Sequence, residues 1–156
     1  MSIRQDALDA LVTILQGITP AAGFSFDLSP PGAVDQGVLT RSLRVESTQS
    51  VHVQVQEGTE EHKAIFVSPD TEREVLLELV LDLMLRGSRD EPPRQRLNRL
   101  IADVNKRVGQ TPTLNNKVQR AHIARVAQPA YDPAGDVAFV AVHVVADYHY
   151  MAGTTI

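Results

Sequence analysis

Two stretches of the chain repeat apolar residues at intervals of three and four, the spacing that gives an amphipathic helix one apolar stripe. The first stretch begins after Ser2, which can cap a helix, and ends near Gly17. The second begins in a proline-containing linker, where Asp90 can serve as the cap, and ends near Gly109. We therefore predict two helices, one near the start of the chain and one past its middle.

Other stretches alternate apolar and polar residues, which is the period of a half-buried strand. This alternation predicts strands at 24–28, 51–55 and 137–150, of which 51–55 and 137–150 alternate most regularly. Residues 63–67 are rich in β-branched and aromatic residues, which also favour a strand, and we predict a further strand at 117–128, where the apolar residues have no clean period. The strand at 63–67 is equally compatible with an extended connection.

Polar, proline-rich or glycine-containing segments separate these elements. They predict a loop at 30–37, an acidic turn at 57–61 and a hairpin turn at 129–136. Residues 151–156 are expected to form a mobile tail.

Residues 71–86 fit both periods, because Glu74, Glu78, Asp82 and Arg86 are spaced by four. Cap residues at the start, many leucines and a glycine at the end favour a helix. As a strand, the same segment places alternate apolar residues on one unbroken face and the charged residues on the other. Local signals lean slightly towards the helix, and the two interpretations stay open at this point.

Composition indicates a single globular domain over residues 1–156. The chain has 156 residues, of which 43% are hydrophobic and 22% charged, so it is long and apolar enough to bury a core. It has no cysteine, which excludes disulfides, thiolate nucleophiles and cysteine-containing metal sites. Its longest apolar run, 137–146, is too short to span a bilayer as a helix. We expect a cytoplasmic product with no membrane partner.

The net charge of −4 averages two very different parts of the chain. Residues 86–125 contain ten basic and three acidic residues, a net charge of +7, whereas the remainder carries −11. Such asymmetry suggests a footprint for nucleic acid or a surface that meets an acidic counterpart on another copy. An ordinary solvated helix face gives the same pattern.

The sequence contains few groups of residues with the spacing of catalytic or metal-binding motifs. No glycine-rich phosphate or dinucleotide loop, serine elbow or metalloprotease histidine pair is present. His143, Asp147 and His149 share one face of the last predicted strand and could offer ligands to a divalent ion. Strand positions four residues apart lie roughly 13 Å apart, however, so an outward polar row is the favoured interpretation.

Residues 60–62, Glu-Glu-His, could form an acid–base group, but they have no nucleophile or positioning partner nearby in the sequence. A solvated hairpin tip is the favoured interpretation. We predict no catalytic residue, no cofactor and no metal.

The order of the elements adds a family resemblance. Alternating valines at 51–55, the Gly58-Thr59-Glu60-Glu61 turn and a closing strand that ends in Ala146-Asp147-Tyr148-His149-Tyr150 resemble the tail terminator (minor tail protein U-like) proteins of long-tailed bacteriophages. The resemblance covers nearly the whole chain and leaves 30–50 unaligned. It implies an α/β (α+β) domain, a mostly antiparallel sheet flanked by two helices, with 74–86 as a strand despite its helix signals.

The resemblance also implies a function. Such a protein forms a homohexameric ring that caps the tail tube, stops its polymerisation and joins the tail to the neck of the head. Its partners are then other copies of itself, the tail tube protein, a neck or connector protein, and genomic DNA that passes through the lumen without sequence recognition. It resides at the head-proximal end of the virion tail after assembly in the host cytoplasm. A neck or head–tail connector is an alternative, and a basic-helix nucleic-acid-binding domain is another.

A ring joins one face of each subunit to a different face of the next. We therefore expect the basic helix of one copy to oppose acidic residues of its neighbour, which would favour ring closure and orient the encounter. The candidate contact residues are Arg94, Arg96, Arg99, Lys106 and Arg107 on the basic side, and Glu57, Glu60, Glu61, Asp70, Glu72 and Glu74 on the acidic side.

Overall fold

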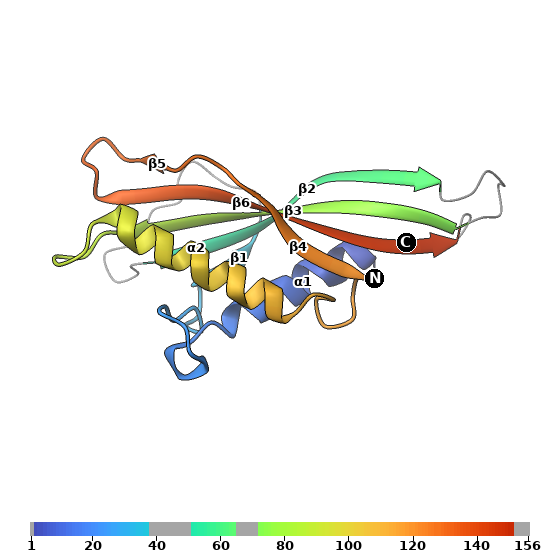
Figure 1. The fold of residues 1–156 in the computed structure, drawn as a ribbon, viewed down its shortest axis with the longest axis horizontal. Coiled ribbons are helices and arrows are strands. Elements are labelled where there is room, and N and C mark those ends of the chain that lie inside the picture. The colour runs from blue at the N-terminus through green and yellow to red at the C-terminus, as the bar shows by residue number, and fades with distance from the viewer. Residues whose placement is uncertain (1, 38–50, 65–71, 152–156) are drawn as a thin grey trace.

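The computed structural model describes residues 2–37, 51–64 and 72–151 of the chain (Figure 1). In chain order, its elements are α1 (Ile3–Gln16), the 3-10 turn η1 (Pro20–Ala22), β1 (Val34–Gln36), β2 (Val51–Ala64), β3 (Glu72–Arg86), α2 (Pro93–Gln110), β4 (Arg120–Val126), β5 (Ala130–Tyr131) and β6 (Val137–Met151). No helix within these ranges is long and apolar enough to cross a membrane.

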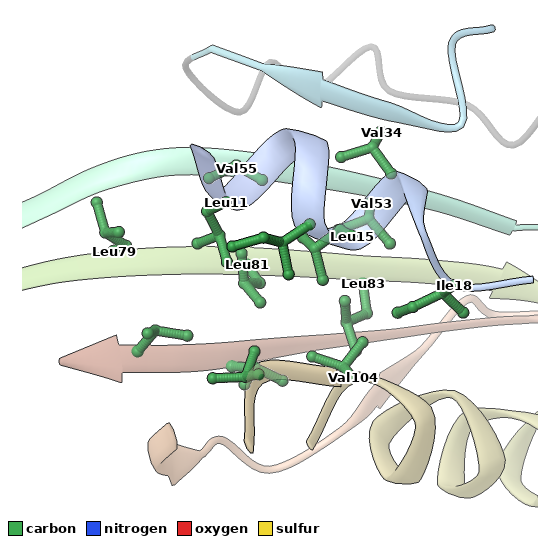
Figure 2. Packing of buried hydrophobic residues seen from close by; sticks show 14 of the residues in the cluster. Leu11, Leu15, Ile18, Val34, Val53, Val55, Leu79, Leu81, Leu83 and Val104 are labelled. Carbon is green, nitrogen blue, oxygen red and sulfur yellow. The ribbon is translucent and has the colours of Figure 1, made fainter. Parts of the chain in front are cut away.

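The strands form one mixed sheet in the order β1-β2-β3-β6-β4, and β5 pairs with β6 beside β4. Only β1 and β2 run parallel, and every other pair is antiparallel. Both helices pack on the same face of this sheet, where Leu11 of α1 and Val104 of α2 meet Leu81 and Leu83 of β3 (Figure 2). The chain is therefore a single α+β domain with a mostly antiparallel sheet and two helices, as the sequence analysis predicted. We call the other face of the sheet, which bears Glu78, the open face.

The segment with conflicting signals is the central strand β3. Its odd-numbered apolar residues all point to the helix-covered face, where Leu77, Leu79, Leu81 and Leu85 are completely buried. Strand β2 pairs along one side of β3, and β6 pairs along its full length on the other. Burial of one leucine is worth about 1.5–3 kcal/mol. Helix propensity distinguishes ordinary residues by at most about 0.7 kcal/mol. The period-two apolar face therefore outweighs the local preference for a helix.

The strand predicted at 24–28 is wrong, although its alternating burial is correct. Phe24 and Phe26 are buried while Ser25 between them is exposed, yet this segment joins no sheet. The backbone amides of Ser25 and Phe26 instead donate to one carboxylate oxygen of Asp103, at 3.0 and 2.9 Å. Because a side chain of α2 satisfies these donors, the segment packs as irregular chain against the helix.

The acidic turn predicted at 57–61 is also wrong, because β2 continues through it. The register between β2 and β3 shifts between Glu57 and Glu60, which identifies a β-bulge. Gly58 serves a close approach in this bulge, since a Cβ atom there would lie 2.8 Å from a carboxylate oxygen of Glu78. Glycine at this position therefore indicates a bulge in a strand rather than the tip of a hairpin.

The remaining differences are small. The predicted loop at 30–37 contains the short strand β1, which pairs with β2. Helix α2 starts at Pro93 with Pro92 as its N-cap and without a side-chain cap, so the cap expected from Asp90 is absent. The hairpin at 129–136 contains β5. The predicted strand at 63–67 is described only at its first two residues, which end β2, and the tail at 152–156 lies outside the described residues.

Candidate functional site

The basic residues proposed for subunit contact are all on α2, but most of them are held by contacts within their own chain. The guanidinium groups of Arg96 and Arg99 lie 5.4 and 5.5 Å from the centre of the Phe26 ring. The Lys106 ammonium lies 4.8 Å from the centre of the Phe24 ring. These cation–π contacts fasten the irregular segment to α2 and hold the cations along one flank of the helix.

Hydrogen bonds fix four of the proposed cations further. Arg96 donates to the backbone carbonyl of Arg86 at 2.6 Å, Arg107 to that of Ile14 at 2.8 Å, and Lys106 to that of Gly23 at 3.2 Å. Arg99 forms a two-pronged ion pair with Glu91. Arg94, by contrast, is simply exposed at the start of the helix. The α2 cations thus have a double role, since they pack the domain and also leave positive charge on its surface.

Two of the proposed acidic residues are likewise engaged inside the subunit. Arg4 at the start of α1 donates to Glu57 at 3.2 Å and to Glu60 at 2.5 Å. Glu61 is exposed, and its carboxylate lies 3.9 Å from the Lys63 ammonium. Glu74 is half-buried on the open face, Glu72 lies at the start of β3, and Asp70 lies outside the described residues.

The carboxylate of Glu60 is the centre of a polar cluster that sequence reasoning missed. Besides Arg4, it accepts a hydrogen bond from the Tyr148 hydroxyl at 3.0 Å, and the Nε2 atom of His62 lies 3.2 Å away. The other ring nitrogen of His62 lies 3.1 Å from the hydroxyl of Tyr150. These residues come from α1, β2 and β6, so no local motif in the sequence predicts the cluster. The bulge shifts the register of β2 just before Glu60, which is paired with Leu77, a residue of the helix-covered face.

The contacts within this cluster shift the pKa values of Glu60 and Tyr148. Burial alone would raise the pKa of Glu60, but the hydrogen bonds from Arg4, His62 and Tyr148 outweigh it and hold that pKa below its usual value. Burial, followed by the hydrogen bond to Glu60, raises the pKa of Tyr148 to about 12. The cluster therefore holds an ionised carboxylate beside a protonated phenol at neutral pH, which is an arrangement that joins α1 to the sheet.

The open face carries a second polar cluster at its middle. The ring nitrogens of His143 lie 3.2 Å from a carboxylate oxygen of Glu78 and 3.1 Å from a guanidinium nitrogen of Arg125. Gln56 donates to Asp82 at 2.5 Å, and burial raises the pKa of that carboxyl, an effect that His143 partly offsets. His143 therefore contacts Glu78 and Arg125 rather than Asp147 and His149, with which the sequence analysis grouped it.

The helix and the strand that carry most of the proposed contact residues extend towards different ends of the domain. In Figure 1, α2 begins at the end of the sheet where β5 lies and runs to the middle of the sheet, whereas β2 ends towards the opposite end. A subunit with basic and acidic surfaces in different places can form contacts of the head-to-tail kind. No protein-family model and no curated protein sequence matches this chain.

Proposed function

We propose that this chain is a structural virion protein of a tailed bacteriophage, a tail terminator that closes the tail tube as a ring of identical subunits. In this role the ring is hexameric, it stops tube polymerisation and it offers its other surface to the neck. The function rests on shape and contact, so no residue acts as a catalyst and no cofactor is needed.

The observation that carries this proposal is the strand β3. Local signals in residues 71–86 lean slightly towards a helix although their apolar alternation also fits a strand, and the resemblance to tail terminators implies an extended segment at 74–86. The segment is a strand of 15 residues at the centre of the sheet. Since cap residues and helix propensity lean towards the opposite outcome, the strand supports the resemblance.

Ring closure then requires that one surface of each subunit meets a different surface of the next. On the basic side, Arg94 is the exposed cation at the start of α2, whereas Lys106 lies over the Phe24 ring and donates to the Gly23 carbonyl. On the acidic side, Glu61 is 65% exposed, whereas Glu60 is 16% exposed and held by Arg4. We therefore narrow the expected contact to Arg94 on the basic side and Glu61 on the acidic side.

The contact is tested by native mass spectrometry of the purified chain. Arg94→Glu should leave a folded protein by circular dichroism and convert the ring to monomers. Lys117→Glu makes the same change of charge outside α2, and it should leave the ring intact. Arg107 is unsuitable for this test, because its bond to the Ile14 carbonyl joins the two helices.

The biological role is tested with the tail tube protein of the same phage. Tubes polymerised with this chain should have a narrow length distribution and a ring at one end in negative-stain images, and tubes polymerised without it should vary in length. A ring that binds the portal instead of the tube would identify a neck connector. A monomer that binds duplex DNA with a steep salt dependence would identify a nucleic-acid-binding domain.

A further inference from the structure

Glu74, Asp147 and His149 lie together on the open face, near the ends of β3 and β6. One donor atom from each residue lies within 4.8 Å of the other two, and all three side chains are half-buried. Glu74 and His149 are directly opposite each other across the two strands, and Asp147 precedes His149 by two residues on the same face. Two neighbouring strands therefore bring one imidazole and two carboxylates to a common point.

Cross-strand pairing removes the objection that the sequence raised against a metal site here. His143 and Asp147 are four residues apart on one strand, and His143 is held by Glu78 and Arg125. Glu74 replaces it from the adjacent strand, where side chains of opposed residues lie only about 5 Å apart. Glu74 lies on β3, so no sequence pattern within β6 could have indicated this ligand.

We propose that these three side chains bind a divalent transition-metal cation, of which Zn²⁺ is the representative. Zinc bonds to nitrogen and oxygen are about 2.0–2.2 Å long, so tetrahedral donors lie about 3.3 Å apart. Closing the present arrangement requires a movement of about 1.5 Å, which rotation of the long Glu74 side chain supplies. Three protein ligands leave a fourth position for water, and the imidazole favours Zn²⁺ over Mg²⁺ or Ca²⁺.

Neighbouring charges set the strength of the site. Lys63 of β2 is opposite Glu74, and Arg120 of β4 is opposite Asp147, so two cations flank the carboxylates on the outer strands. The Lys63 ammonium also lies 3.9 Å from Glu61. These cations reduce the local negative charge. Binding should therefore be moderate in strength.

Isothermal titration of the full, untagged chain with ZnCl₂ at neutral pH tests the site. The wild-type protein should bind one Zn²⁺ per chain, and His149→Ala and Asp147→Asn should each weaken binding by about tenfold or more. His122→Ala is the matched control, because His122 is an exposed histidine on the same face, and it should bind as the wild type does. Thermal unfolding without metal verifies that each variant is folded.

Two further measurements make the result decisive. Co²⁺ substitution should give a visible absorption spectrum that is lost in His149→Ala, and Glu74→Gln provides a third ligand variant should Asp147→Asn fail to fold. The absence of measurable Zn²⁺ binding, or equal binding by His149→Ala and His122→Ala, would overturn the proposal. Displacement of Zn²⁺ by an equal concentration of Mg²⁺ would also overturn it, because it would indicate a nonspecific acidic patch.

Discussion

The carboxylate of Glu60 should contribute measurably to folding, because it joins the start of α1 to β2 and β6. The side chain is 16% exposed and has three polar partners, Arg4 at 2.5 Å, Tyr148 at 3.0 Å and His62 at 3.2 Å. Replacement by glutamine preserves the shape and removes the charge. The new amide oxygen can still accept from Tyr148, but the amide nitrogen is a donor that cannot accept from Arg4 or His62.

The magnitude follows from the exposure of each partner. A hydrogen bond to a charged group contributes about 1.5–3 kcal/mol when it is buried. Arg4 is 38% exposed, so its ion pair with Glu60 should contribute closer to the roughly 0.2–1 kcal/mol that is typical of surface pairs. The contact between Glu60 and the partly exposed His62 is assigned a similar contribution. Glu60→Gln should therefore lower the free energy of unfolding by about 1–2 kcal/mol. In a domain of this size that corresponds to a decrease in Tm of about 2–8 °C.

The loss should also depend on pH in a definite direction. The folded-state pKa of Glu60 is lowered, so the unfolded chain binds a proton more readily than the folded chain does. The contribution is therefore complete above the unfolded pKa and is lost as the pH falls through the folded pKa. The difference in stability between wild type and Glu60→Gln should be largest near neutral pH and should shrink in acid.

Urea unfolding of both proteins at equal concentration and several pH values measures these quantities. Glu61→Gln is the control, because that side chain is 65% exposed and should change stability by less than about 0.5 kcal/mol. Equal stability of the Glu60 and Glu61 variants at neutral pH would refute the reasoning. A deficit of Glu60→Gln that persists unchanged in acid would show that its origin is packing rather than charge.

Three further predictions follow from individual contacts. Asp103→Ala should destabilise the domain by about 2–4 kcal/mol in urea unfolding, because it removes the acceptor of two backbone amides and leaves them unpaired in a mostly buried setting. Gly58→Ala should lower the free energy of unfolding by about 1–3 kcal/mol, because the new methyl group would lie 2.8 Å from a carboxylate oxygen of Glu78. A methyl group at Gly109 meets no atom within 4 Å, so Gly109→Ala should stabilise α2 by about 0.5–1 kcal/mol. In a spectrophotometric pH titration, Tyr148 should ionise near pH 12, and Tyr148→Phe should remove that late step.

The elements that sequence reasoning predicted correctly are those whose apolar pattern extends over many residues. Helix α1, the valine segment 51–55 of β2 and the long strand β6 each present one uninterrupted apolar face, and burial enforces that face directly. Strand β3 shows the limit of this reasoning. Its four-residue charge spacing satisfies both periods, and only the strands paired on its two sides decide between them.

Two errors in the prediction share one cause, which is a polar partner that is distant in the sequence. Asp103 supplies the acceptor that makes a strand at 24–28 unnecessary, from 77 or more residues away. Arg4 and Tyr148 convert the supposed hairpin tip at Glu60 into a fixed cluster, across separations of 56 and 88 residues. Local composition contains no trace of these partners, so the residues looked like solvated turn positions.

These internal contacts also bear on the contrast between the basic segment 86–125 and the acidic remainder of the chain. Arg96 and Arg107 donate to backbone carbonyls, and Arg99 pairs with Glu91, so each guanidinium is oriented within its own subunit. Side chains held in this way lose rotational freedom when the chain folds. Because that entropy is already lost, the subunit contact proposed for α2 would cost less side-chain entropy on binding. The contacts that hold these residues within the subunit are therefore compatible with the proposed interface.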